Sequence, residues 1–229
     1  MLKEIKVIAF DADDTLWDCQ GHFEEVMEQL YTELEPWTDR ERAATELYAT
    51  ERKNMPLLGY GTKAFTLSVL ETAMRVSGDT MPVERLRYLL ERCYGLLQFP
   101  TTPLPEVLET LIALQQRQRR MVVFTKGELL DQENKLKRSG LAGFFDYVEI
   151  TSDKTEREFS ELCRKLSIKP GELLMVGNSL KSDVAPALAI GAWAVHIPFH
   201  VTWELEHAES FSHDRLFSIE HFGELLEIL

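Results

Sequence analysis

Hydrophobic residues in the second half of the chain alternate between short runs and longer stretches with helical spacing. Four apolar runs have the length of buried strands: Met121–Phe124, Tyr147–Ile150, Leu173–Val176 and Trp193–Ile197. Apolar residues that recur every three or four positions predict helices near residues 104–118, 128–139, 155–167 and 182–190. Strands that alternate with helices in this way are typical of βαβ units and a parallel sheet. A last strand near Leu216–Ile219 and a helix from Glu220 complete the pattern.

The first half of the chain has a different pattern. The run Lys6–Phe10 predicts one buried strand, but no strand-length run follows it for a long stretch. Apolar residues instead recur at helical spacing in four segments, near residues 20–35, 38–54, 62–77 and 82–98. Proline and glycine residues predict breaks between these helices at Pro36, at Pro56–Gly61 and at Gly78–Pro82.

This helical block interrupts the α/β pattern directly after its first strand. A connection of roughly 80 residues is far longer than an ordinary loop of about 2–6 residues. We therefore expect residues 18–98 to form an inserted all-α subdomain, placed to act as a cap. Residues 1–17 and 99–229 are expected to form a three-layer, Rossmann-like core with a parallel sheet.

Composition and charge exclude several classes of protein. The 229 residues are 45% hydrophobic and 28% charged, which is typical of soluble globular proteins. The net charge is −13, and no basic stripe is visible beyond the short Arg117–Arg120 patch, so we expect no nucleic-acid partner. The longest apolar runs are too short to cross a bilayer, so we expect no membrane partner either.

Cysteine usage and the N-terminal pattern indicate a cytoplasmic protein. Cys19, Cys93 and Cys163 are widely separated and have no metal-ligand spacing. The N-terminal apolar stretch leads into an acidic cluster that begins at Asp11, where the apolar region of a signal peptide would continue. An odd number of cysteines without a signal peptide is typical of reduced thiols, so these residues are expected to serve in packing.

Polar side chains follow four of the predicted strands. They are Asp11 and Asp13, Thr125, Lys154, and Asn178 with Asp183. Because the carboxyl ends of parallel strands meet at one edge of a sheet, we expect these side chains to converge on one crevice. Acidic residues also favour helix starts, but the later strand ends argue against a simple cap. Asp14 and Thr15 are expected to shape the turn after the first strand.

A cluster of carboxylates needs a proton or a cation to hold it together. Two carboxylates about 4 Å apart repel by about 4 kcal/mol at an effective dielectric constant of about 20. Oxygen ligands and a phosphate substrate favour Mg²⁺, which typically binds through one or two protein carboxylates, waters and a phosphate oxygen. The acidic cluster therefore predicts a Mg²⁺ site that also binds a phosphate group.

The same residues suit hydrolysis of a phosphate monoester. Lys154 supplies positive charge, and the Thr125 hydroxyl can bind phosphoryl oxygens. A carboxylate nucleophile divides the hydrolysis into two displacements through an aspartyl-phosphate, and Asp11 is the candidate. A second carboxyl group must protonate the leaving alkoxide and then deprotonate water, and Asp13 is the candidate for this role.

Four segments carry a family resemblance. They are Asp11-Ala-Asp13-Asp14-Thr15, Val122–Gly127, Ser152–Lys154, and Met175–Ser179 with Asp183. In this order and at these strand ends they resemble the four motifs of the haloacid dehalogenase superfamily, and the helical block resembles the family's cap. The resemblance covers essentially the whole chain. Each motif is weak alone, and their order and spacing make the match specific.

The resemblance implies roles for the matching residues. Asp11 is the expected nucleophile and a metal ligand, and Asp13 is the expected acid/base, with its main-chain carbonyl on the metal. Thr125, Lys126 and Lys154 are expected to bind the phosphoryl group. The halide-removing members of the superfamily lack an aspartate two positions after the nucleophile, so Asp13 favours phosphoryl chemistry on a small phosphorylated metabolite.

The expected metal site departs from the family pattern at one position. The resemblance implies that Asp183 completes the site, but Asn178 stands where many members have an aspartate. An amide oxygen can ligate Mg²⁺ but supplies no charge, so we expect a weaker, working site.

Other functions remain open from the sequence. Phosphomutases of the same superfamily keep the second aspartate, so that reaction is the alternative to hydrolysis. Signalling receivers also use aspartates, threonine and lysine, but they are shorter and have no such insertion. A non-catalytic binding protein on this fold has only Asn178 in its favour.

The sequence identifies neither the substrate nor the oligomeric state. In the insertion, Gly59-Tyr60-Gly61-Thr62-Lys63 is a candidate substrate-facing loop, with Tyr60 and Lys63 as specificity residues; an ordinary loop between helices fits equally. His196, His200 and His207 are expected to have structural or surface roles.

Overall fold

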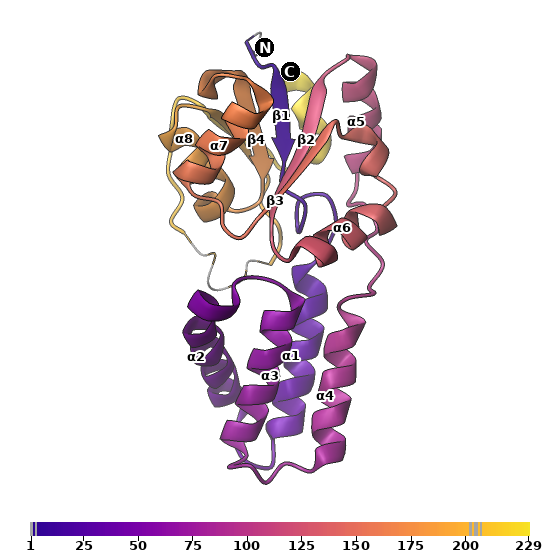
Figure 1. Cartoon of the computed structure of the whole chain (residues 1–229), viewed down its shortest axis with the longest axis vertical. Helices are drawn as coiled ribbons and strands as arrows, with labels where there is room; N and C mark the ends of the chain where they lie inside the picture. Colours follow the sequence, from indigo (N-terminus) through magenta and orange to yellow (C-terminus); the bar gives the residue numbers. More distant parts are fainter. Residues whose placement is uncertain (1, 3, 202, 204–205, 207) are drawn as a thin grey trace. The chain divides into compact units, whose positions relative to one another are not determined.

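The computed structural model describes residue 2, residues 4–201, residues 203 and 206, and residues 208–229. The chain forms two compact units. One unit consists of Met1–Cys19 together with Thr101–Leu229, and the other consists of Gln20–Pro100. The first unit contains the sheet, and the second contains the helices that follow the first strand (Figure 1).

Six strands within the described residues of the first unit form one sheet, in the order β3-β2-β1-β4-β5-β6. Their bounds are β1 Val7–Phe10, β2 Arg120–Lys126, β3 Tyr147–Thr151, β4 Leu173–Gly177, β5 Trp193–His196 and β6 Leu216–Ser218. Neighbouring strands are parallel throughout, and Val7 lies opposite both Arg120 and Leu173. The carboxyl end of β1 therefore lies between those of β2 and β4.

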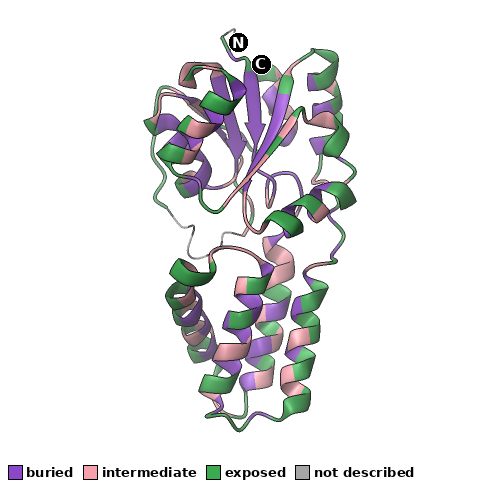
Figure 2. Cartoon of the chain, viewed as in Figure 1, coloured by how far each residue is buried: buried purple, intermediate pink, exposed green. Residues whose placement is uncertain are grey.

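Helices cover both faces of this sheet, which explains why its central strands are apolar along their whole length. The helices are α5 Val107–Gln116, α6 Leu129–Arg138, α7 Glu156–Leu166, α8 Ala185–Ala189 and α9 Leu225–Ile228. On one face Phe159 of α7 packs edge to face against Phe124 of β2. On the other face Phe10 of β1 stacks on Phe222, just before α9. The central strands β1 and β4 are accordingly buried along their whole length (Figure 2).

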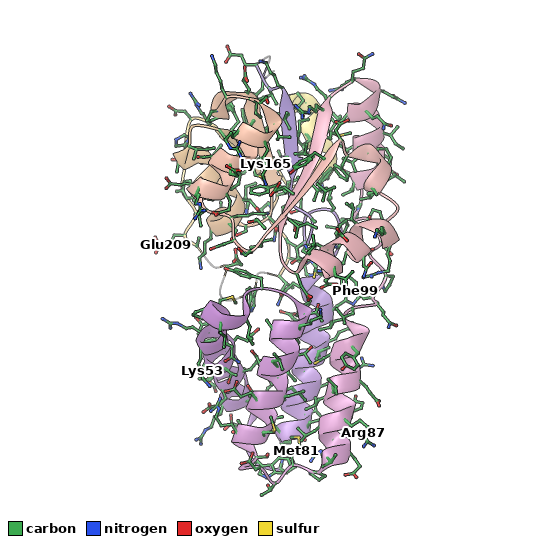
Figure 3. The ribbon with its side chains drawn as sticks, viewed as in Figure 1. Lys53, Met81, Arg87, Phe99, Lys165 and Glu209 are labelled. Carbon is green, nitrogen blue, oxygen red and sulfur yellow. The ribbon has the colours of Figure 1, made fainter. Side chains whose placement is uncertain are left out.

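The second unit is helical throughout its named elements, which are α1 Gln20–Leu34, α2 Arg40–Leu58, α3 Thr62–Val76 and α4 Val83–Gly95. Its helices share one apolar core, to which Leu30, Leu47, Val69 and Leu89 each contribute a side chain that is 1% exposed or less. Charged side chains such as that of Lys53 point to solvent (Figure 3). The helical periodicity of the sequence is therefore the pattern of this core.

The predicted fold class is confirmed: an α/β core with a parallel sheet and an all-helical insertion after β1. Cys19, Cys93 and Cys163 are buried free thiols. Within the described residues, the structure contains no helix with the length and apolar character needed to cross a membrane.

The break expected at Pro56 is wrong, because α2 continues through this residue to Leu58. A proline in the last turn of a helix removes a single main-chain hydrogen bond, which the rest of the helix tolerates. The helix ends at Gly59, which has a φ of 70° and donates its N–H to Met55 O at 2.9 Å. Glycine adopts this conformation without strain.

Two elements beside the expected site also differ from prediction. β2 is longer than expected and includes Thr125 and Lys126, because their main chain pairs with β3. The helix expected near residues 182–190 is instead a π-helical turn, Leu180–Val184, followed by α8. Pro186 lies in the first turn of α8, where a helix tolerates a proline because the N–H groups there have no partner within the helix.

Candidate active site

The turn after β1 brings Asp11 to the carboxyl edge of the sheet. Its N–H still pairs with β4, donating to Val176 O at 2.9 Å, and the residue is only 7% exposed. Asp14 then adopts a φ of 62° and accepts a hydrogen bond from the Cys19 N–H, so it shapes the turn as expected. Thr15 also faces the site, with its Oγ1 3.3 Å from Asp11 Oδ2.

Lys154 joins two carboxylates that are far apart in the sequence. Its Nζ lies 2.5 Å from Asp11 Oδ1 and 2.6 Å from Asp183 Oδ1, and the lysine side chain is 1% exposed. Burial alone would lower the pKa of Lys154, but the charges of Asp11 and Asp183 outweigh it and raise the pKa. The site thus holds a permanent positive charge between two acidic groups.

The ionised form of Asp11 is destabilised in spite of this lysine. Burial, followed by the charge of Asp183, raises the pKa of Asp11 to about 7, although Lys154 acts in the opposite direction. A raised pKa means that the carboxylate is poorly stabilised, and a further cation would stabilise it.

Gly177 makes room for Asp183. A Cβ atom at Gly177 would lie 2.3 Å from Asp183 Oδ2, far inside van der Waals contact. This close approach lets the N–H of Ser179 donate to Asp183 Oδ2 at 3.0 Å. The end of β4 therefore requires a glycine because the Asp183 carboxylate packs against its main chain.

Asp13 lies in a separate set of hydrogen bonds. Its carboxylate accepts from Trp17 Nε1 at 2.8 Å, from Gln132 Nε2 at 3.1 Å and from Lys135 Nζ at 2.9 and 3.1 Å. Burial would raise the pKa of Asp13, but the charge and hydrogen bonds of Lys135 lower it below its usual value. The Asp13 carboxylate is thus held in place and ionised in this arrangement.

Gln132 links this acid to the threonine at the end of β2. Its Nε2 lies 2.8 Å from Thr125 Oγ1 and 3.1 Å from Asp13 Oδ2, and the residue is 3% exposed. Because the Thr125 oxygen accepts a hydrogen bond from Gln132, its own O–H is left to donate to another group. One buried amide therefore orients both side chains.

The structure brings the remaining core residues of the predicted site to the same edge. The Asn178 amide oxygen lies 3.2 Å from the Thr15 hydroxyl that faces Asp11. The Lys126 ammonium pairs with Glu206 and donates to Ser182 Oγ at 2.7 Å.

Tyr60 and Lys63 belong to the helical unit. Tyr60 is half-buried in the loop between α2 and α3, and Lys63 is exposed in the first turn of α3. Their proposed contact with substrate stays a prediction.

Gln132, Lys135 and Glu206 were not among the site residues predicted from the sequence. Gln132 and Lys135 are three positions apart on α6, so they lie on one face of the helix, and that spacing was visible in the sequence. A buried lysine cannot be distinguished from a surface lysine by composition alone. Glu206 follows no motif, and no signal in the sequence marks it.

The donor set fits Mg²⁺. Among the described residues no three His, Cys, Asp or Glu side chains are grouped closely enough to hold a metal ion. Mg²⁺ needs fewer, since one or two carboxylates with neutral oxygens and water are its usual ligands. Asp11 and Asp183 face a common point, where the Lys154 ammonium now acts as the cation. The amide oxygen of Asn178 is the neutral donor nearby.

The described histidines at the end of β5 and after it do not form a metal cluster. His196 Nε2 lies 3.0 Å from the Asn178 main-chain oxygen, and burial lowers the pKa of His196. The ring of His200 contacts that of Phe199. His207 lies outside the described residues.

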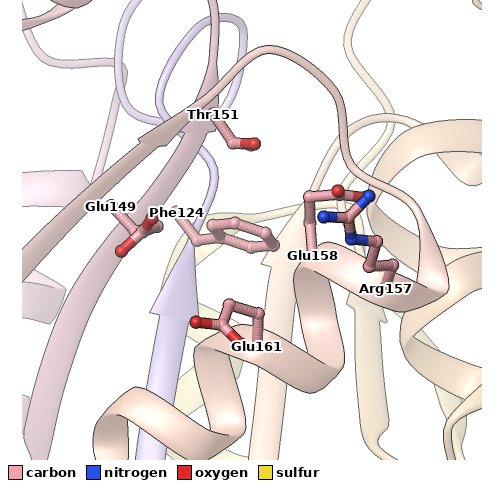
Figure 4. A pocket seen from close by; sticks show the side chains of 6 residues that line it. All are labelled: Phe124, Glu149, Thr151, Arg157, Glu158 and Glu161. Atoms are coloured by element: carbon pink, nitrogen blue, oxygen red, sulfur yellow. The ribbon is translucent and has the colours of Figure 1, made fainter.

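A cavity of about 320 Å³ lies between β3 and α7 (Figure 4). Its lining residues are Phe124, Glu149, Thr151, Arg157, Glu158 and Glu161. Three glutamates make it a poor site for a phosphate, and each already has a partner: Lys165 for Glu149, Thr155 for Glu158 and Arg164 for Glu161. The carboxylates at the sheet edge are the better candidate.

Comparison with known proteins decides the family. The model for haloacid dehalogenase-like hydrolases matches residues 5–191. The chain belongs to this family. Its relatives include the glyceraldehyde 3-phosphate phosphatase of Methanothermobacter thermautotrophicus, which is 29% identical over 98% of this chain and 100% of the relative. The predicted membership of the family, and with it an enzyme related to phosphatases, is confirmed.

Solved structures of haloacid dehalogenase-like proteins have the same fold. A family hydrolase from Xanthomonas campestris has a TM-score of 0.88 and 28% identity, covering 98% of this chain and 91% of its own. The hydrolase YfnB of Bacillus subtilis, solved with bound magnesium, has a TM-score of 0.70 and 17% identity, with 99% of both chains covered.

Proposed function

We propose that this haloacid dehalogenase-like hydrolase is a Mg²⁺-dependent phosphatase that hydrolyses a small phosphomonoester of the sugar-phosphate type. The observation that carries the proposal is the Lys154 ammonium, bound between Asp11 and Asp183. These three side chains form one buried group, in which Asp11 is the candidate nucleophile, Lys154 the cation and Asp183 a second carboxylate. The glyceraldehyde 3-phosphate phosphatase relative supports the substrate class.

In the first step, an Asp11 oxygen attacks phosphorus, and the bond from phosphorus to the ester oxygen breaks. Lys154 neutralises charge on the transferring phosphoryl group, and the Thr125 hydroxyl donates to one of its oxygens. Gln132 orients that hydroxyl, as its contact with Thr125 Oγ1 indicates. The product is an aspartyl-phosphate on Asp11 and an alcohol.

Asp13 moves the protons in both steps. It gives one to the leaving alkoxide and later takes one from the water that breaks the bond between phosphorus and the Asp11 oxygen. The contact with Lys135 favours ionised Asp13, and this is the form that deprotonates water. The first step needs the protonated form, which a dianionic substrate favours by raising the pKa of a nearby acid.

Mg²⁺ would be held by Asp11, Asp183, Asn178 and the main-chain carbonyl of Asp13, and when bound it neutralises the charge between phosphate and nucleophile. The raised pKa of Asp11 is the physical reason that a cation is needed. Asn178 contributes no charge, so the affinity for Mg²⁺ is expected to be lower than with an aspartate there.

A screen against phosphorylated metabolites tests the proposal. The purified chain is assayed with Mg²⁺ on triose and other sugar phosphates and on p-nitrophenyl phosphate, beside Asp11→Asn and Asp13→Asn. Asp214→Asn is the matched control, because Asp214 is exposed on the same unit. We expect hydrolysis by the wild type and the control only.

Two results contradict the proposal in different ways. If the wild type hydrolyses no phosphomonoester, including the aryl phosphate, the chain is not a phosphatase. If Asp11→Asn keeps full activity, the phosphatase uses another nucleophile. Trapping of phosphate on the wild type, and not on Asp11→Asn, would locate the covalent intermediate.

A further inference from the structure

Glu206 places an internal carboxylate beside the candidate active site. It lies in the segment between β5 and β6, and its side chain is 11% exposed. The carboxylate pairs with the Lys126 ammonium and accepts hydrogen bonds from Ser179 Oγ at 2.6 Å and from Ser182 Oγ at 2.5 Å. The Glu206 carboxylate thus makes the kinds of contact that would bind an anionic ligand.

The groups that hold Glu206 are direct neighbours of the catalytic residues. Lys126 follows Thr125 at the end of β2, and Ser182 precedes Asp183. Ser179 also donates its N–H to Asp183 Oδ2. An ammonium group with two hydroxyls is a donor set that suits a carboxylate or a phosphate.

We propose that Lys126, Ser179 and Ser182 form an anion-binding subsite next to the phosphoryl group and that Glu206 fills this subsite. The enzyme therefore prefers phosphomonoesters without a second anionic group. The inference rests on the phosphatase function proposed above. It also changes the expected role of Lys126, whose ammonium is neutralised by Glu206 and binds the distal end of a substrate only when Glu206 is removed.

Electrostatic repulsion by Glu206 disfavours substrates that carry a second anionic group. A substrate carboxylate that approaches Lys126 meets the Glu206 charge and must displace it or lie beside it, and both cost free energy. An aldehyde or hydroxyl group at the same place is not repelled in this way. Specificity is the difference in binding free energy between the anionic and the uncharged substrate. Glu206 therefore acts mainly by disfavouring the anionic one.

The test compares two substrates that differ at one carbon: glyceraldehyde 3-phosphate, with an aldehyde, and 3-phosphoglycerate, with a carboxylate. The measured quantity is the ratio of kcat/KM for 3-phosphoglycerate to that for glyceraldehyde 3-phosphate. We expect Glu206→Gln to raise this ratio about tenfold or more, mainly through KM, because one negative charge near the carboxylate is removed. Hydrolysis of p-nitrophenyl phosphate reports the intact reaction.

Two further variants separate the subsite from a general effect of charge. Glu209→Gln removes the same charge from an exposed position of the same segment (Figure 3), and the ratio should stay at the wild-type value. Glu206→Gln combined with Lys126→Met should lose the gain, because the ammonium that would bind the carboxylate is absent.

Binding gives a second readout if Glu206→Gln slows turnover. In the Asp11→Asn background, calorimetry should show tighter binding of 3-phosphoglycerate when Glu206→Gln is added. An unchanged ratio and an unchanged affinity, with aryl phosphatase activity retained, overturn the subsite and leave the phosphatase function standing. An equal fall in kcat/KM for both substrates, without tighter binding, assigns Glu206 a structural role and overturns the proposal as well. Failure of the wild type on every phosphomonoester contradicts the phosphatase function itself.

Discussion

Lys135 Nζ lies within hydrogen-bonding distance of both oxygens of the Asp13 carboxylate, at 2.9 and 3.1 Å. The lysine side chain is 3% exposed, so a buried cation on α6 is directed at the proposed acid/base. Burial would lower the pKa of Lys135, but the charge of Asp13 outweighs it and raises the pKa. The pair therefore stays charged, and it fixes the position of Asp13 as well as its protonation state.

Lys135→Met should lower kcat about 10²-fold, within the usual contribution of acid/base catalysis, while KM changes less. Loss of the cation raises the pKa of Asp13, so the acidic limb of the kcat profile should move to higher pH. Steady-state kinetics between pH 5 and 9 measure both effects. Lys137→Met is the matched control, since Lys137 is exposed on the same helix. A profile that keeps its acidic limb in place would contradict this role for Lys135.

Gln132→Met should impair the phosphoryl-binding step and the proton transfer together. The variant keeps the side-chain length but removes the amide that contacts Thr125 and Asp13. We expect kcat/KM for p-nitrophenyl phosphate to fall about tenfold or more, since oriented hydrogen-bond donors are a large part of phosphoryl transfer. Thr125→Val should cost less in the Gln132→Met background than in the wild type, because the two act as one unit. Fully additive losses would argue against the link.

The division into a sheet and a helical insertion was predictable because each has its own periodicity. β1 reads as a buried run, and α1 to α4 bury one face in a common core. Asp11, Lys154 and Asp183 were also predictable, because the carboxyl ends of parallel strands must meet at one edge. The contacts of Lys154 with both aspartates are the geometry that this rule implies.

The residues that hold Asp13, Thr125 and Lys126 in position were not predictable in the same way. Lys135 and Gln132 act through hydrogen bonds to groups outside their own helix. Asp13 lies more than a hundred positions away along the chain, and Thr125 lies on β2, so the helical pattern of α6 does not reveal these contacts. Glu206 lies between β5 and β6, and no motif or periodicity in the sequence marks it as a residue of the site. The end of α2 was misjudged for a local reason, since the cost of Pro56 depends on its distance from the helix end.

Gly177→Ala should weaken Mg²⁺ binding more than it weakens the fold. The added methyl group would overlap Asp183 and force its carboxylate away from Lys154. We expect the Mg²⁺ concentration for half-maximal activity to rise about tenfold, as for other changes that displace a metal ligand. Gly143→Ala is the control, because a Cβ there meets no atom within 4 Å. Equal Mg²⁺ dependence in both variants would mean that Asp183 does not bind the metal.

Lys63→Met tests the loop between α2 and α3. If Lys63 contacts the substrate, as the sequence suggested, KM for sugar phosphates should rise several-fold, while that for p-nitrophenyl phosphate changes little. Lys53→Met serves as the control, since Lys53 is an exposed lysine of the same unit that pairs with Glu71. The same KM in both variants would assign Lys63 to the solvated surface.

The raised pKa of Asp11 predicts an unusual dependence of stability on pH. Its pKa of about 7 in the folded chain lies well above the usual value of 3.8, because burial and Asp183 oppose its ionisation. Between these two pH values the folded chain binds more protons at Asp11 than the unfolded chain, so this residue makes the free energy of unfolding fall as pH rises. Asp11→Asn removes that titration, and it should raise the melting temperature at pH 8 more than at pH 5.

Mg²⁺ should cancel the difference in melting temperature between the wild type and Asp11→Asn at pH 8. A cation between the carboxylates stabilises ionised Asp11 in the folded state, so adding Mg²⁺ at pH 8 should raise the melting temperature of the wild type and leave that of Asp11→Asn less affected. Thermal denaturation at pH 5 and pH 8, with and without Mg²⁺, measures the four values for each protein. Asp214→Asn should follow the wild type throughout. If Asp11→Asn melted below the wild type by the same amount at both pH values, ionised Asp11 would be a stabilising group, and the need for a cation at this position would lose its physical basis.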